Sequence, residues 1–189
     1  TWDTTADQPD FITVGTTPSF LTIEDYAADV DQARLFSGCG VSSLSISIAP
    51  NQMVQATFGV VGKDMAISAS EIASVTASSG NAPFDAYSGD LQIGNNVAGL
   101  ASSAIITAID FNVTNSFAPT FVVGSDETPA LEVGRAEVTG SFSAYFEDDA
   151  LINRFLNETE SAIQVSVNDP TSANAYTFLF PRVKINSAD

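Results

Sequence analysis

Residues Phe36–Met65 read FSGCGVSSLSISIAPNQMVQATFGVVGKDM, and the alternation within them decides the fold. In the first half, Leu44, Ile46 and Ile48 alternate with serines, which is the period-two pattern of a strand with one apolar face. Residues 49–52 (APNQ) have the composition of a turn. Alternation resumes beyond the turn, with apolar residues at Val54, Ala56, Phe58 and Val60. The stretch therefore predicts a long two-stranded hairpin.

The polar face of this hairpin consists of small, uncharged side chains. It carries serines on the outgoing strand, and glutamine and threonine on the returning strand. Exposed strand edges normally carry lysine, which prevents edge-to-edge pairing with other chains. Because this hairpin lacks that protection, we expect it to pair with other copies of the chain, or to line a surface that the copies form together.

The composition of the 189-residue chain allows one well-filled core, since 44% of its residues are hydrophobic. Its charge is lopsided, with 23 acidic residues, 6 basic residues, no histidine and a net formal charge of −17. Binding to nucleic-acid phosphates or to an anionic membrane surface requires lysine and arginine, so both kinds of binding are disfavoured. The composition suits a protein that works close to nucleic acid without adhering to it.

The single cysteine, Cys39, cannot form an internal disulfide and is expected to be a small buried apolar residue. A catalytic cysteine would need a histidine partner, which the sequence lacks. No window holds about 18 consecutive apolar residues, so we expect no membrane-spanning helix. We also expect no signal peptide.

Outside the hairpin, the sequence predicts an arm, further strands and one helix. Residues 1–19 are polar and threonine-rich and predict an extended N-terminal arm, whereas 20–189 predict a single β domain. The helix is expected to begin with Asp148 as its N-cap and to carry an apolar stripe at 151, 152, 155 and 156. Strands are expected at 20–24, 90–93, 105–113, 132–146, 162–167 and 175–185, and loops at 25–32 and 68–81. This pattern indicates a mainly β chain, an antiparallel β-sandwich or partly open barrel with one flanking α-helix.

Two acids at the end of the predicted helix, Glu158 and Glu160, lie where cations are preferred by the helix dipole. One interpretation is that they are simply solvated, at little energetic cost. The other is that they form an inter-subunit contact with an arginine of a second copy.

We find no pattern that supports catalysis, a cofactor or a metal ion. Nucleophile elbow, P-loop, zinc and dinucleotide motifs are absent from the sequence. The acidic clusters at 126–127 and 147–149 lack the ligand spacing of a known calcium loop and are interpreted as solvated or helix-capping charge. We therefore expect the protein not to be an enzyme.

Four sequence blocks together resemble the tail tube (major tail) proteins of long-tailed bacteriophages. They are GCGVSSLSISIAPNQMVQATFGVVGKDM at 38–65, FVVGS at 121–125, VGRAEVTGSFSAYFEDDALINRFLNETES at 133–161 and YTFLFPRVK at 176–184. The resemblance covers the chain from about Phe36 to its end, and the N-terminal arm contributes little to it.

The resemblance implies a virion structural subunit with the tail tube fold. Six subunits would close a homo-hexameric ring around one continuous inner barrel, and the rings would stack into a hollow tube that conducts the DNA genome without binding it specifically. Assembly would take place in the host cytoplasm and involve no membrane. The tail tip and head-proximal terminator proteins would be the further partners.

On this basis, the polar face of the hairpin and one acid of a later strand are predicted to face the lumen of the tube. The predicted lumen-facing residues are Ser43, Ser45, Ser47, Gln55, Thr57 and Asp110. The opposite assignment, in which this face packs under the helix or a neighbour, stays open because a one-residue register slip inverts the faces of a strand. A self-assembling pilin-like or surface-layer subunit is the alternative function.

Overall fold

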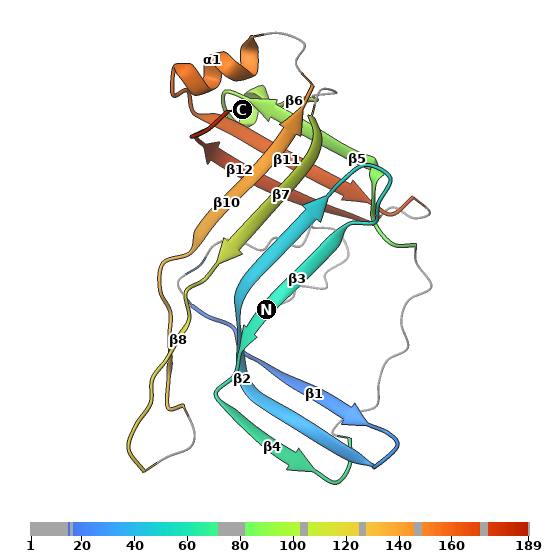
Figure 1. Ribbon diagram of the computed structural model, residues 1–189, viewed down its shortest axis with the longest axis vertical. Coiled ribbons are helices and arrows are strands. Elements are labelled where there is room, and N and C mark those ends of the chain that lie inside the picture. The colour runs from blue at the N-terminus through green and yellow to red at the C-terminus, as the bar shows by residue number, and fades with distance from the viewer. Residues whose placement is uncertain are drawn as a thin grey trace. The chain divides into compact units, whose positions relative to one another are not determined.

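A computed structural model describes residues 15, 17–71, 82–102, 106–124, 128–145, 149–170 and 174–188 (Figure 1). The described chain is mainly β with one α-helix, its paired strands are antiparallel, and they form no closed barrel within a single copy. The predicted fold class is therefore confirmed. Most of the predicted N-terminal arm lies outside the described residues.

The predicted strands and the helix are present with shifts at their ends, but the strand predicted at 132–146 is divided into 131–132 and 137–144, and several short elements were not predicted. The elements are β1 Leu21–Ala27, β2 Gln32–Ile48, β3 Gln55–Val61, β4 Asp64–Ser68, β5 Asp85–Gly94, the 3-10 helix η1 Val97–Gly99, β6 Ala101–Ser102, β7 Ile106–Thr114, β8 Ala118–Pro119, β9 Leu131–Glu132, β10 Glu137–Ala144, α1 Ala150–Leu156, β11 Ser161–Asn168 and β12 Ala175–Val183. The predicted hairpin is confirmed as β2 and β3. The loop predicted at 25–32 is wrong at both ends, because β1 continues to Ala27 and β2 begins at Gln32.

The chain divides into two compact units. The first holds the described residues of Thr1–Ser43, Phe58–Ser74 and Thr114–Glu137, and the second holds those of Leu44–Thr57, Val75–Val113 and Val138–Asp189. The long strand β2 contributes residues to both units. The single domain predicted over 20–189 stays a prediction.

In the first unit, the N-terminal part of β2 pairs with β1 on one side and with β4 on the other. Cys39 of β2 is buried, as predicted, and its thiol donates to the carbonyl of Phe36 at 3.3 Å. Lys63 lies 5.0 Å from the ring centroid of Phe20, a cation–π contact. The ring of Phe20 in turn packs against that of Phe117.

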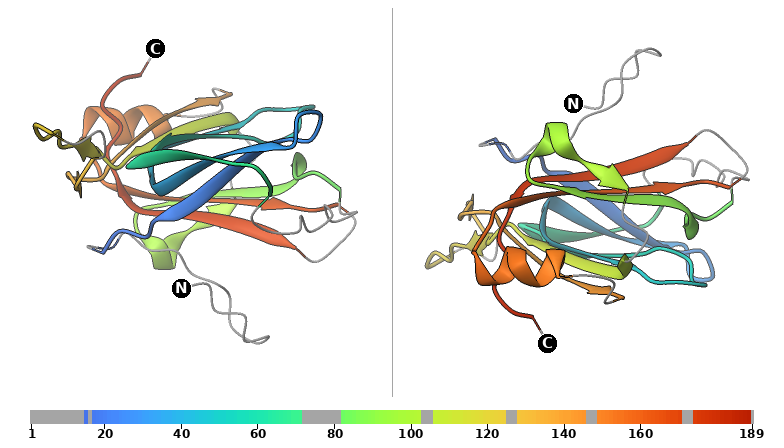
Figure 2. Two further views of the ribbon diagram at one scale, coloured as in Figure 1. Left: turned by 90° about the horizontal axis from the view of Figure 1, so that it is seen from below. Right: turned by 90° about the horizontal axis from the view of Figure 1, so that it is seen from above.

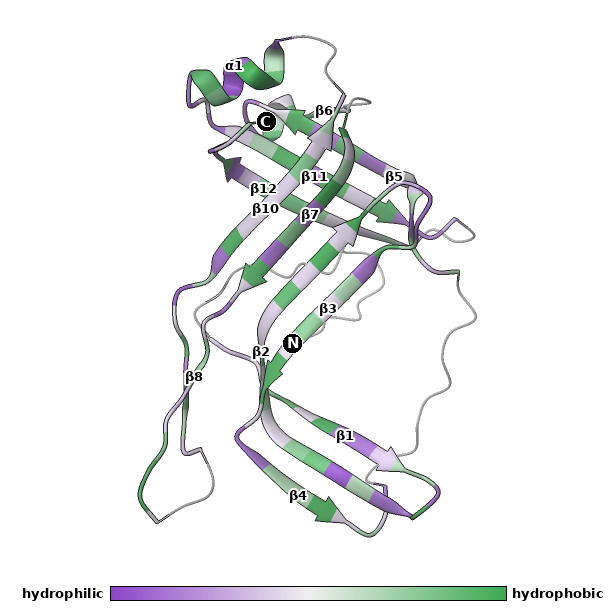
Figure 3. Cartoon of the chain, in the orientation of Figure 1, coloured by the Kyte–Doolittle hydropathy of each residue, from purple (hydrophilic) through white to green (hydrophobic). Residues whose placement is uncertain are grey.

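The second unit is a sandwich around one apolar core. One layer consists of parts of β2, β3, β7 and β10, and the other has the strand order β12-β11-β5-β6 (Figure 2). Alternate residues of β11 are buried, and apolar and polar residues also alternate along β2 and β7 (Figure 3). The buried core residues are Ile46, Ile48, Ile109, Phe111, Ile163, Val165 and Val167.

Within the second unit, the side chain of Arg154 anchors α1 to strands β5 and β11. Its guanidinium donates to the Ser161 hydroxyl at 2.9 Å and to the Gly94 carbonyl at 3.4 Å. Ser161 is almost fully buried, so Arg154 satisfies a hydroxyl that water does not reach. The predicted N-cap, Asp148, lies outside the described residues. Asp149 occupies the N-cap position, and its side chain makes no capping hydrogen bond.

Replacing Phe111 by alanine should lower the free energy of unfolding by about 3–5 kcal/mol, the usual cost of removing a buried phenylalanine. Phe111 is buried, and its ring packs at 4.9 and 5.0 Å from those of Phe178 and Phe180 in the facing sheet. Urea unfolding of the purified chain would measure the change. The control is Tyr87→Ala, because Tyr87 is 95% exposed and its removal should change stability by less than about 0.5 kcal/mol. Equal effects of the two substitutions would contradict this description of the core.

Candidate functional site

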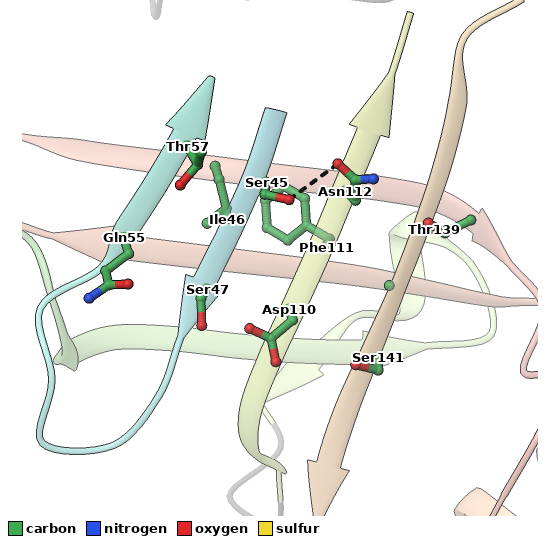
Figure 4. A pocket seen from close by; sticks show the side chains of 11 residues that line it. Ser45, Ile46, Ser47, Gln55, Thr57, Asp110, Phe111, Asn112, Thr139 and Ser141 are labelled. Atoms are coloured by element: carbon green, nitrogen blue, oxygen red, sulfur yellow. Dashed lines mark hydrogen bonds between the residues drawn. The ribbon is translucent and has the colours of Figure 1, made fainter. Parts of the chain in front are cut away.

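A shallow polar groove crosses one sheet of the second unit (Figure 4). Its volume is about 450 Å³ and it is open to solvent. Four strands contribute to it, namely β2, β3, β7 and β10. We define the polar groove by its eight polar side chains: Ser45, Ser47, Gln55, Thr57, Asp110, Asn112, Thr139 and Ser141.

The alternation of the strands places these polar side chains on one face, because successive residues of a strand point to opposite sides. Between the serines of β2 lies Ile46, and beside Asp110 lies Phe111, both of which are buried in the core. A one-residue slip of either strand would put polar groups into the core and apolar groups into water. The core contacts therefore fix which face of this sheet is polar.

The groove offers hydroxyl and amide groups and a single carboxylate. Figure 4 shows the Ser45 hydroxyl donating to Asn112 Oδ1, at 3.3 Å, across β2 and β7. Asp110 is exposed and takes part in none of the ion pairs among the described residues. Gly140 of β10 faces the Asp110 carbonyl so closely that a Cβ atom there would lie 2.7 Å from the oxygen. This glycine permits the close approach of β10 to β7.

None of the six basic side chains of the chain lines the groove. Arg34 pairs with Asp25, Arg182 with Glu160 and Lys184 with Glu158. The remaining three are Arg154 of α1, which donates to Ser161, Lys63 over the Phe20 ring and the exposed Arg135. Within the groove, the only formal charge is thus the negative charge of Asp110.

Glu158 and Glu160 both have cationic partners within the chain. An inter-subunit contact was one interpretation of these two acids. Glu160 Oε1 lies 2.6 Å from an Arg182 guanidinium nitrogen, and Glu158 Oε2 lies 2.6 Å from Lys184 Nζ. Hydrogen bonds from these cations, and then their charge, lower the pKa of each carboxyl below its ordinary value. Both pairs are exposed. Whether these acids also contact a second copy stays a prediction.

Removing one cation should raise the pKa of its partner carboxyl. In Arg182→Met the pKa of Glu160 should rise while that of Glu158 stays low, and in Lys184→Met the reverse should hold, because each carboxyl has its own hydrogen-bonded cation. Since the folded-state pKa of each carboxyl is lowered, both pairs stabilise the fold at pH values above the ordinary glutamate pKa. Their contribution is lost as the pH falls through the lowered value. NMR titration of the carboxyl carbons would measure both changes, and pKa values that do not respond to loss of the cation would contradict the assignment.

The structure brings together five of the six predicted lumen-facing residues. Ser45, Ser47, Gln55, Thr57 and Asp110 all line the polar groove. Ser43 belongs to the first unit, where it lies half-buried against Gly59. That any of these residues faces a lumen stays a prediction.

Three groove residues were not predicted to face the lumen: Asn112, Thr139 and Ser141. Alternation in the sequence could have identified them. Asn112 shares the face of Asp110, and Thr139 and Ser141 alternate with apolar residues of β10. The described residues contain no cluster of acids, cysteine or histidine that could hold a metal ion. The acidic cluster at 126–127 lies outside them, as do 147 and 148. No helix within the described ranges is long and apolar enough to cross a membrane.

Comparison with known proteins adds one finding. The family model described as "Phage tail tube protein" matches residues 1–189. The match extends over both units and includes the N-terminal residues, which the sequence blocks at 38–184 did not cover. A search of the curated proteins found no match.

Proposed function

Because the chain belongs to the phage tail tube protein family and is thus a structural component of the virion tail, we propose that it is the subunit repeated along the tube. Six copies close each ring, the rings stack, and the genome leaves the particle through the lumen. The polar groove faces that lumen. One observation supports this arrangement best, namely an exposed sheet face with hydroxyl and amide groups, one carboxylate and no cation.

The chemistry of this face suits passage of DNA without adhesion. Proteins hold duplex DNA chiefly through lysine and arginine, which displace the counterions condensed on its phosphates. The groove offers no such group, so little attraction opposes sliding. Asp110 adds one negative charge per copy, and its repulsion of phosphate reaches over a Debye length, roughly 8–10 Å at moderate salt.

In the sheet that carries the groove, β3 and β10 are edge strands to which strands of neighbouring copies can be added. Among the described strands, β3 pairs with β2, and β10 lies at the end of the order β1-β2-β7-β10. Each therefore leaves one side of its backbone for a further strand, and pairing of the two edges between copies would satisfy these groups. A sheet continued from copy to copy around a ring has no free edge.

A ring of six copies carries a formal charge of six times −17, or −102. Such a charge keeps subunits soluble and discourages attachment to DNA outside the tube. We assign assembly to the host cytoplasm, and the tail tip and head-proximal terminator proteins as the partners at the two ends. Membership of a structural family supports the proposal that the protein is not an enzyme and needs no cofactor.

Negative-stain microscopy of the purified chain tests the proposal. Concentrated protein should form hollow tubes whose end views show six-fold rings. Solid filaments would instead favour a pilin-like subunit, and flat lattices a surface-layer subunit. Protein that stays monomeric at every concentration would contradict self-assembly.

A further inference from the structure

The hairpin of β8 and β9 ends in three consecutive exposed apolar side chains, Phe121, Val122 and Val123, which we call the apolar tip. Phe121 is 83% exposed and Val123 is fully exposed. A run of three such residues in water is unfavourable and, in a folded protein, usually marks a binding surface. Gly124, with a φ of 89°, follows the tip.

The stem of this hairpin is anchored, so the tip is held out by a fixed support. The backbone N–H of Thr120 donates to the carbonyl of Ala130 at 3.3 Å, and its hydroxyl donates to the same oxygen at 3.0 Å. Leu131 is buried, and the Thr128 N–H donates to the Lys63 carbonyl at 3.1 Å. A tip whose stem is fixed by such bonds loses less entropy when it binds than one on an unanchored loop would.

A concave site with three apolar and three polar lining residues lies in the other unit, between α1 and the segment that follows β12. We call it the helix crevice; its volume is about 450 Å³ and its lining residues are Phe155, Leu156, Glu158, Lys184, Ile185 and Asn186. Its volume is within the range of roughly 300–1,000 Å³ in which protein clefts accept ligand groups. Its apolar members include Leu156, which is 66% exposed.

From this complementarity, and resting on the proposed function, we infer that the apolar tip of one copy docks in the helix crevice of a second copy. Other copies of this chain are the neighbours that a tube subunit meets. The contact also suits two chains that each carry a charge of −17. Phe121, Val122 and Val123 carry no charge, and at the crevice Glu158 and Lys184 offset one another, so neither surface itself adds net charge to the contact, although Asp126 and Glu127 follow the tip in the sequence.

Tip and crevice belong to different surfaces of the chain, so the contact is heterologous. Each copy that inserts its tip into a neighbour still offers its own crevice to another copy. Such contacts build either a closed ring or an open stack of copies, whereas a two-fold contact between identical surfaces stops at a dimer. The contact would add a connection between subunits that is independent of strand pairing at β3 and β10.

Disulfide trapping tests the contact directly. Copies carrying Val123→Cys are mixed with copies carrying Leu156→Cys under mild oxidation, at concentrations too low for tubes to form. We expect a covalent heterodimer, because docking brings the two cysteines within the range of a disulfide. The matched control is Val30→Cys mixed with Leu156→Cys, since Val30 is also an exposed valine. No heterodimer, or equal yields in both mixtures, would overturn the inference.

The assembly of Val123→Asp provides the second measurement. Its critical concentration for tube formation should rise at least about tenfold, because the carboxylate loses its water on docking and cannot replace the contacts of the valine with Phe155, Leu156 and Ile185. Val30→Asp, which adds the same charge elsewhere, should change it less than about twofold. If native protein forms tubes but the cysteine copies are not trapped and Val123→Asp assembles normally, the docking inference is overturned and the proposed function stands. Trapping without tubes would instead contradict the proposed function and leave the contact standing.

Discussion

One of two proline variants of β3, Ala56→Pro or Thr57→Pro, should fold normally and fail to assemble into tubes. In an edge strand, the N–H groups of adjacent residues point to opposite sides, so one of these two groups bonds to β2 and the other points to the open edge. Proline removes the N–H and blocks strand pairing on that side. The variant that loses the inner bond should be destabilised, whereas the variant that loses the outer one should retain its fold.

The expected effect on assembly is large. Each lost ladder bond costs about 1 kcal/mol, and the proline ring also keeps the neighbouring strand at a distance. Because about 1.4 kcal/mol is a tenfold change in an equilibrium constant, the critical concentration should rise at least about tenfold. Thermal unfolding identifies the folded variant, and sedimentation measures its assembly. Val138→Pro and Thr139→Pro in β10 form the equivalent pair at the other edge. Normal tubes from every folded variant would contradict pairing at these edges.

Asp110→Lys should leave tubes intact and slow DNA ejection about tenfold. Asp110 is exposed, lines the polar groove and bonds to no cation among the described residues, so the substitution disturbs no ion pair. Six lysines around each lumen would release counterions from the phosphates and hold the DNA. Because this attraction weakens with salt, raising the ionic strength should restore most of the rate.

Ejection is measured on phage particles that carry the variant subunit, triggered in vitro. Two controls separate the local charge from the total charge. Asp110→Asn removes the acid without adding a cation and should have a small effect. Asp29→Lys makes the same change of charge in the turn between β1 and β2 and should eject at the native rate. Equal slowing by Asp29→Lys, or an unchanged rate for Asp110→Lys, would count against a role of the groove in conduction.

Much of this fold could be predicted because its signals are local. The hairpin of β2 and β3, the inward direction of Ile46 and Ile48, and the exposed position of Asp110 all follow from alternation along single strands. Helix α1 follows from its apolar stripe.

The parts that could not be predicted depend on residues distant in sequence. Glu158 and Glu160 find their cations 26 and 22 residues away, because the pairing of β11 with β12 brings Ser161 opposite Val183. The strand β4 was missed because its five residues carry little pattern and form a strand by pairing with β2. Long-range pairing of this kind leaves no periodic signal in a single sequence.

Alternation along β3 does not determine which of its apolar residues are buried. The apolar residues of β3 alternate as predicted, but only Val54, just before the strand, packs against the core, while Phe58 and Val60 are exposed. Alternation shows which residues share a face, but it does not show how far the opposing sheet extends. These two side chains belong to the first unit, whereas Val54 belongs to the second.

A cryo-electron microscopy reconstruction of the assembled tube would locate both the bore and the contacts between copies. Ser45, Thr57 and Asp110 should line the bore, and β3 of one copy should be hydrogen-bonded to β10 of the next. Side chains of the polar groove on the outer wall, or β3 and β10 unpaired between copies, would contradict this arrangement.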